Sequence, residues 1–311
     1  MDSKVKVATR QSFGEALLEL GKKNKNVVVL DSDLSGATKT DLFAKEFPDR
    51  FFDMGIAESD MIGTAAGLAA SGKIPFAATF AVFATGRCYD QIRASVAYPK
   101  LDVKICGTHA GITVGEDGAT HQMLEDIGLM RGMPNMTVLT PSDKFSAMWA
   151  VEYAAKVKGP VYIRLARMAT PVIYNEKTSF DKLSITHGSG KDATIFATGV
   201  EVAECLLAKE ELEREGIDVR VVDMLSMKPI DEDVILKCSK ETKCLISVED
   251  HSIINGLGSA IADVLIEKNP VLLHKIGMKD TFGQSGKAEE LLKHYGLDSK
   301  SIVKKVKGLV R

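Results

Sequence analysis

Short apolar runs alternate with longer stretches of helical periodicity along the first half of the chain. The apolar runs are rich in Val and Ile and predict β-strands, whereas the stretches between them predict helices. This alternation is typical of βα units on a parallel sheet. The expected strands are 27–30, 74–80, 103–107, 137–139 and 161–165, and the expected helices are 12–22, 60–71, 86–97, 122–131 and 143–157.

A second βα series follows after residues 168–188, which show neither a helical period nor sustained alternation. A length of 311 residues agrees with two domains of ordinary size. We therefore expect an α/β protein with a first domain at 1–170, a linker at 171–188 and a second domain at 189–311, each with a mostly parallel sheet flanked by helices. The expected strands of the second series are 193–198, 218–222, 244–248 and 272–276, and its helices are 200–214, 231–239, 256–267 and 286–295.

Composition and charge exclude several classes of partner. The chain has 40 basic and 42 acidic residues, so no overall field attracts nucleic acid or an anionic membrane. No apolar run reaches the length of about 18 residues that a membrane helix needs, and the polar start lacks the apolar core of a signal peptide. The five cysteines form no CxxC pair, which favours buried, reduced thiols. We expect a cytoplasmic protein that binds neither nucleic acid nor membrane.

Glu58 lies at the start of a helix of unusually small residues, within the segment DMGIAESDMIGTAAGLA. One interpretation is an acid that the helix dipole stabilises. The other follows from the apolar neighbours Met54, Ile56 and Met61, which would raise the proton affinity of a buried carboxylate. A carboxyl group in such surroundings can share a proton with a ligand.

Phe80 ends the apolar strand 74–80 and Phe83 follows it, at the carboxyl edge where open α/β sheets place their ligands. The two rings could be ordinary core aromatics or a surface on which a flat ligand stacks. For Phe83 the residues favour neither interpretation over the other.

The richest constellation is the loop GTHAGITVGEDGATHQ at 107–122, which places two histidines and two acids after a strand. Loops at this edge commonly carry catalytic groups. A metal site is disfavoured because His109 and His121 are separated by a long glycine-rich stretch, unlike usual zinc spacing. A simple Asp-Gly turn at Asp117 would leave both histidines unexplained.

The strand segment GPVYIRLAR contains two arginines, Arg164 and Arg167, and a third, Arg10, lies at the start of the first helix. Arg164 and Arg167 are expected on opposite sides of the strand, so one would form an ion pair and the other could bind phosphate through its planar guanidinium. The residues alone indicate that Arg10 is an exposed arginine at a helix start.

These segments resemble transketolases, which are thiamine-diphosphate enzymes, and the resemblance covers nearly the whole chain. It rests on the Glu58 segment, on ATFAVF, GEDGATHQ and GPVYIRLAR, and on 247–260 and 282–286 in the second domain. It implies a pyrimidine-binding domain followed by a transketolase C-terminal domain. For the cofactor, it implies that Glu58 hydrogen-bonds N1′ of the aminopyrimidine, and that Phe80, Phe83, Ile56 and Asp33 contribute to the cleft.

For the substrate, the same resemblance implies that Arg10, Arg167 and His109 lie toward the phosphate of a sugar. Asp117 would contact the sugar hydroxyl next to the new bond, and His121 the reacting hydroxyl and carbonyl of the donor. At the position of the family's phosphate-binding serine this chain has Ala37, so Ser35 or Thr38 would have to substitute. For the polar pair Glu249 and His251 of the second domain, the residues favour packing over a ligand site.

One part of a transketolase is missing from the sequence: the GDG motif and following Asn that hold the diphosphate and Mg²⁺. The resemblance therefore implies the C-terminal subunit of a split transketolase, a pentose-phosphate type of enzyme that transfers a two-carbon ketol group between sugar phosphates. It would bind the pyrimidine half of thiamine diphosphate, take Mg²⁺ ligands from an N-terminal partner, and form a homodimer within a heterotetramer.

Two other functions agree less well with these residues. The β subunit of a 2-oxo-acid dehydrogenase shares the expected fold. A 2-oxo acid, however, has no sugar hydroxyl for a residue of GEDGATHQ to bind. A regulatory subunit without catalysis is disfavoured because Glu58, His109, Asp117 and His121 are all present.

Overall fold

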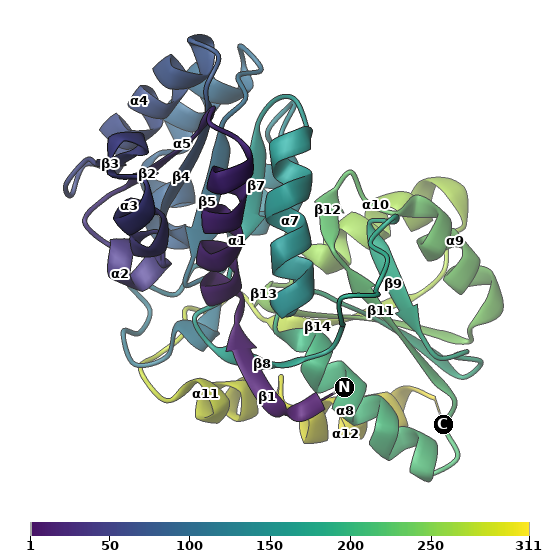
Figure 1. Ribbon diagram of the computed structural model, residues 1–311. Helices are drawn as coiled ribbons and strands as arrows, with labels where there is room; N and C mark the ends of the chain where they lie inside the picture. The colour runs from purple at the N-terminus through teal and green to yellow at the C-terminus, as the bar shows by residue number, and fades with distance from the viewer. Residues whose placement is uncertain (1, 311) are drawn as a thin grey trace.

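The computed structural model describes residues 2–310, and its first sheet has seven strands in the order β12-β6-β7-β5-β4-β2-β3 (Figure 1). Six of these strands run parallel, and β12 pairs antiparallel with β6. The parallel α/β arrangement expected for the first half is confirmed. The strands are β2 (Val27–Asp31), β3 (Phe51–Asp53), β4 (Ile74–Phe80), β5 (Lys104–Thr108), β6 (Thr137–Leu139), β7 (Val161–Arg164) and β12 (Ser226–Lys228).

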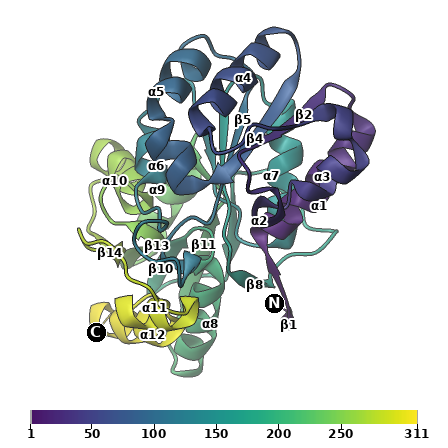
Figure 2. The same cartoon turned by 90° about the vertical axis from the view of Figure 1, so that its left-hand side faces the viewer.

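Helices cover both faces of this sheet, as a parallel sheet requires. On one face α1 (Thr9–Lys23) and α7 (Lys144–Lys156) pack side by side over Val27 and Val29 (Figures 1 and 2). On the other face α4 (Glu58–Ala70) packs over the alternate residues of β2 and against β4, and α6 (Asp126–Arg131) packs beside β6. Shorter elements fill the connections: α2 (Ser35–Thr38), α3 (Asp41–Glu46), η1 (Pro48–Arg50), η2 (Val82–Arg87), α5 (Tyr89–Gln91), η3 (Ile92–Ala97) and η4 (Ile112–Val114).

The segment expected as one helix at 86–97 differs from that expectation. It consists of two π-helical stretches, η2 and η3, on either side of the short α5. A π-helical turn holds an extra residue, so the side chains of this segment are rotated relative to a regular helix. Such bulges are frequent at functional sites, and η2 begins directly after Phe80 and Ala81.

The second sheet has five strands in the order β14-β13-β10-β11-β9, all parallel except the edge strand β9. Helices α8 and α12 pack beside each other on one face (Figure 2). The amphipathic α12 was not anticipated, although Ile302, Val303 and Val306 already mark its buried face. The elements are β9 (Ser184–His187), β10 (Ala193–Ala197), α8 (Glu201–Arg214), β11 (Val219–Met224), α9 (Glu232–Glu241), β13 (Cys244–Ser252), α10 (Leu257–Lys268), β14 (Leu273–Met278), α11 (Ala288–Tyr295) and α12 (Ser299–Leu309).

Several short strands link the two halves of the chain. A two-stranded antiparallel sheet joins β1 (Asp2–Ala8) to β8 (Ala169–Val172), and β9 lies inside the expected linker 171–188. The strand β12 follows β11 after a single residue, Leu225, yet belongs to the first sheet. The chain thus passes from one sheet to the other and back.

The cysteines are all buried and free, as expected. Among residues 2–310, no helix is both long and apolar enough to cross a membrane. Within the same residues, no cluster of His, Cys, Asp and Glu side chains has the arrangement of a metal site.

Candidate active site

Glu58 is the first residue of α4 and is only 3% exposed. Its Oε2 accepts a hydrogen bond of 2.6 Å from Nη1 of Arg87, whose side chain is half-exposed. The purely apolar setting expected for this carboxylate is therefore wrong, because a guanidinium lies against one of its oxygens. Among the described residues no donor bonds to the other oxygen, Oε1.

An aromatic cluster lies at the end of β4. The rings of Phe80 and Phe83 are stacked with centroids 5.8 Å apart, and the ring of His109 stacks on Phe80 at 3.8 Å. His121 meets both phenylalanines edge-on, at 6.3 and 5.6 Å. The guanidinium of Arg87 lies 4.5 Å from the centroid of Phe83, so this cluster continues to Glu58.

His109 is buried and neutral. Its Nε2 accepts a hydrogen bond of 3.1 Å from Nη1 of Arg10, so its proton is on Nδ1 and is donated to Oγ1 of Thr108 at 2.9 Å. Thr108 in turn donates to the carbonyl of Thr79. Burial, together with the charges of Arg10 and Arg167, lowers the pKa of His109 to about 3. His109 therefore contributes shape and hydrogen bonding, and the positive charge near it belongs to the arginines.

Arg10 and Arg167 form a basic pair on the same side. Arg10 donates to the carbonyl of Ala37 at 2.7 Å, and its buried Nε has no hydrogen-bond partner among the described residues. Burial, and next the charge of Arg167, lower the pKa of Arg10. Arg167 is one-third exposed; it donates to the carbonyl of Val114 at 2.7 Å and pairs with Asp117 at 3.3 Å. An unused donor beside a second guanidinium is a favourable place for an anion.

Arg164 is the structural member of the two arginines in GPVYIRLAR. Its Nε donates to Oδ2 of Asp126 at 2.8 Å, and its Nη2 donates to the carbonyl of Asp250 at 2.8 Å. All three residues are buried. Arg167 instead lies beyond the end of β7, where its side chain reaches the glycine-rich loop 107–122.

The segment around Ala37 is organised by Asp31. This buried carboxylate accepts hydrogen bonds from the hydroxyls of Thr38 and Thr40, at 2.6 and 2.9 Å. Thr38 is fully buried and already engaged, whereas Ser35 is only half-buried. Of the two residues expected as substitutes for the family's serine, Ser35 is thus the more accessible. Asp33 lies nearby on the rim, exposed and with a left-handed backbone, φ 58°.

The structure therefore brings Glu58, Phe80, Phe83, His109 and His121 into one cluster, with Arg10, Arg167 and Asp117 beside it. Ile56 lies at the rim and is 80% exposed. Sequence reasoning missed Arg87 and the positioning hydroxyl of Thr108. A signal for Arg87 existed, because it follows Phe83 by four residues and so faces the same way on a helix.

Two family models match the two halves of the chain: the transketolase pyrimidine-binding domain over residues 5–172 and the transketolase C-terminal domain over residues 181–302. The chain belongs to the transketolase family. It is 54% identical over 305 residues to a Methanocaldococcus jannaschii protein described as a transketolase C-terminal section, with 96% of this chain and 94% of that protein covered.

Human transketolase is 37% identical over 310 residues, but this chain covers only 49% of it, so the transketolase-like sequence here corresponds to about half of that enzyme. Among solved structures, one titled split gene transketolase, inactive beta4 tetramer, is 48% identical with a TM-score of 0.90, covering 98% of this chain and all of that one. The chain thus corresponds to the C-terminal section of a split transketolase.

The residues present fit the aminopyrimidine of thiamine diphosphate, the cofactor that a transketolase pyrimidine-binding domain implies. Glu58 offers a buried carboxylate with a free oxygen, and the stacked rings of Phe80 and Phe83 offer an aromatic surface beside it. A carboxyl that shares a proton and a flat apolar wall are what a protonatable aromatic heterocycle needs.

Proposed function

We propose that this chain is the C-terminal subunit of a thiamine-diphosphate transketolase, which transfers a two-carbon ketol group from a ketose phosphate to an aldose phosphate. The observation that carries the proposal is the shared sheet edge. There a buried carboxylate beside stacked aromatic rings lies next to a basic pair, Arg10 and Arg167. The first arrangement suits the cofactor's pyrimidine, and the second suits the phosphate of a sugar.

Glu58 has the acid–base role in this proposal. Its free Oε1 would share a proton with N1′ of the aminopyrimidine, while Oε2 stays bonded to Arg87. Bound thiamine diphosphate supplies nucleophilic chemistry at C2 of its thiazolium ring. Phe80 and Phe83, with Ile56 and Asp33 at the rim, would form this chain's part of the cleft and exclude water from it.

The catalytic loop would bind the sugar. Asp117 is expected to accept a hydrogen bond from the hydroxyl beside the new bond, and His121 to contact the reacting hydroxyl and carbonyl of the donor. In the structure Asp117 pairs with Arg167. Phosphate binding at Arg167 and Arg10, with the neutral His109 beside them, would compete with this ion pair and so release Asp117 toward the sugar. Phosphate recognition and hydroxyl recognition would then be coupled.

The diphosphate and Mg²⁺ ligands are assigned to an N-terminal partner subunit that carries the GDG motif and its Asn. The exposed Ile56 beside the cofactor cleft supports a surface that another chain covers. The similar solved structure whose title calls it an inactive beta4 tetramer also supports a need for a partner. We propose a heterotetramer with two copies of each chain. The buried free thiols support a cytoplasmic location.

The test compares the chain alone with the reconstituted complex. Calorimetric titration of the purified chain with Mg²⁺ and thiamine diphosphate should show weak binding or none, and ketol transfer should be absent. Adding the GDG-bearing partner should produce activity. Micromolar binding together with turnover in the absence of a partner would contradict the proposal.

The choice of substrate needs a second arm of this assay. One relative, 42% identical over 297 residues, is a 6-deoxy-6-sulfo-D-fructose transketolase subunit from Clostridium sp.. The two arginines would suit a sulfonate as well as a phosphate, since both groups are anions with several acceptor oxygens. The donor series should therefore contain a ketose phosphate and a sulfonated ketose, and our proposal requires the phosphate to be the better donor.

A further inference from the structure

The catalytic loop at 109–122 lacks regular secondary structure apart from one short turn. Its backbone takes left-handed conformations at His109, Gly111, Gly115 and Gly118, with φ between 57° and 89°. The single 3₁₀ turn, Ile112–Val114, has no side-chain cap from its own N-cap residue. The backbone donors at the start of such a turn need acceptors from elsewhere.

Asp250, on the strand β13 of the C-terminal domain, supplies these acceptors. Its Oδ1 accepts a hydrogen bond of 2.8 Å from the backbone N–H of Ile112. Its Oδ2 accepts from the hydroxyl of Thr113 at 2.7 Å and, over a longer 3.4 Å, from the backbone N–H of Thr113. The carboxylate is 1% exposed, so these contacts form in a setting where an unmade hydrogen bond is expensive.

The fit between Asp250 and the loop is close. A Cβ atom built on Gly111 would lie 2.0 Å from Oδ2 of Asp250, so only glycine lets the loop approach the carboxylate. The position of Asp250 is itself fixed, because its carbonyl accepts the hydrogen bond from the buried Arg164. Arg164 comes from the pyrimidine-binding domain, so contacts in both directions hold the loop and β13 in register.

A second segment of the C-terminal domain holds the far end of the loop. Nε2 of Gln122 donates to the carbonyls of Ile112 and Gln284, at 3.2 and 3.0 Å. A Cβ atom built on Gly118 would lie 2.4 Å from Oγ of Ser285. Asp117 and His121, which flank Gly118 and Gln122, are thus carried by a backbone that rests on the second domain.

We propose that Asp250 is a positioning residue for ketol transfer, which acts through the backbone of Ile112 and Thr113 to orient the loop that carries His109, Asp117 and His121. This inference rests on the proposed function for the roles of those three side chains. It gives the C-terminal domain a task in the reaction beyond subunit packing.

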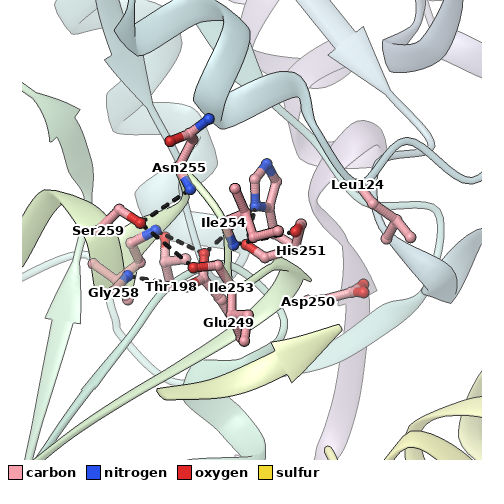
Figure 3. Close-up of polar contacts among 12 residues, drawn as sticks. Leu124, Thr198, Glu249, Asp250, His251, Ile253, Ile254, Asn255, Gly258 and Ser259 are labelled. Carbon is pink, nitrogen blue, oxygen red and sulfur yellow. Dashed lines mark hydrogen bonds and ion pairs between the residues drawn. The ribbon is translucent and has the colours of Figure 1, made fainter. Parts of the chain in front are cut away.

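The neighbouring residue provides a matched control. Glu249 precedes Asp250 on β13, is equally buried, and accepts hydrogen bonds from the backbone N–H groups of Leu257 and Gly258, at 2.6 and 3.0 Å. Figure 3 shows Glu249 directed toward Gly258 and Asp250 directed away from it. Each carboxylate thus accepts hydrogen bonds from backbone N–H groups: Glu249 from the start of α10, and Asp250 from the catalytic loop.

The first experiment uses the chain alone and does not depend on the enzyme's activity. In Asp250→Asn, the amide N–H₂ replaces one acceptor and faces the donors of the loop. We expect hydrogen–deuterium exchange in peptides covering 109–122 to become at least about tenfold faster, while Glu249→Gln leaves these peptides unchanged. Equal protection of the loop in wild type and Asp250→Asn would overturn the proposal.

The second experiment uses the reconstituted complex and separates two steps. Asp250→Asn should lower kcat/KM for ketol transfer by about a hundredfold, the effect of misplacing reacting groups by about 1 Å. Exchange of the thiazolium C2 proton depends on Glu58 and should stay at the wild-type rate. Glu249→Gln should keep both rates. If Asp250→Asn and Glu249→Gln lose ketol transfer equally, the role is merely structural and the proposal fails.

A more conservative variant, Thr113→Val, tests the proposal even if Asp250→Asn does not fold. Thr113→Val keeps the side-chain shape and removes only the hydroxyl that Asp250 accepts, so we expect about a tenfold loss of kcat/KM. If Asp250→Asn does not fold and Thr113→Val keeps the wild-type activity, the proposal is also overturned. A wild-type complex without any ketol transfer would instead refute the proposed function, and the exchange experiment would still decide the position of the loop.

Discussion

Replacing Arg167 with alanine tests the anion site directly. Arg167 is a suitable target because its side chain is one-third exposed and rests on the loop 109–122 without forming part of the buried core. The other candidate, Arg10, is bonded to both Ala37 and His109, so its loss would also disturb the histidine. Arg167→Ala should therefore report on phosphate binding with little change in folding.

The expected change in KM follows from the contacts that Arg167 makes in the structure. Its pairs with Asp117, at 3.3 Å, and Glu116, at 3.7 Å, are partly exposed, and such pairs contribute at most about 1 kcal/mol. A charge-assisted hydrogen bond to phosphate is worth about 1.5–3 kcal/mol. Because phosphate must replace Asp117 and solvent, we take the lower end, about 1.5 kcal/mol. This value corresponds to about a tenfold rise in KM.

The assay measures KM of the reconstituted complex for a phosphorylated donor and for its unphosphorylated analogue. Arg167→Ala should raise KM for the phosphorylated donor about tenfold and leave the analogue almost unchanged. Arg214→Ala, which removes the same charge from the exposed end of α8, is the control. Equal losses on both donors would refute the assignment of Arg167 to phosphate.

Three further predictions concern the same edge of the sheet. Glu58→Gln should slow exchange of the thiazolium C2 proton by about 10²–10⁴-fold, and a wild-type exchange rate would contradict the acid–base role. Thr38→Val should lower the melting temperature, because it removes the hydrogen bond to Asp31. Ser35→Ala should instead raise KM for sugar phosphates. A raised KM in Thr38→Val together with a lowered melting temperature in Ser35→Ala would contradict these roles. Between pH 6.5 and 3 only the unfolded chain takes up a proton on His109, because the folded structure lowers the pKa of this histidine to about 3. The contribution of His109 to stability is therefore lost as pH falls from 6.5 toward 3, and an NMR titration midpoint above about 5 would contradict this.

The sequence predicted the parallel sheets and the main residues of the site because both depend on local patterns. The strands β2 and β4 are almost entirely apolar, and β2, β4 and β5 are buried along their whole length, as in a parallel sheet that helices cover on both faces. The site residues lie where these strands and their loops end, so a motif such as GEDGATHQ places its side chains at a known edge.

Other features depend on contacts between distant segments, which no local pattern encodes. The ion pair of Glu58 with Arg87 joins α4 to η2, and the side-chain hydrogen bonds of Asp250 join segments 137 residues or more apart. The π-helical form of 82–87 was equally hidden, because apolar periodicity resembles that of an ordinary helix. The strand β12 was missed because Met227 is the only apolar residue among its three, so it has no apolar run of the kind that marks β6.

The placement of β12 has a consequence for dividing this protein. Residues 226–228 come from the second half of the chain but cover β6, which would otherwise be an open edge of the first sheet. A fragment cut after residue 170 would contain the candidate site of this chain yet expose the backbone donors and acceptors of β6, a template for aggregation. Any minimal version of the pyrimidine-binding half must therefore carry a substitute for residues 226–228.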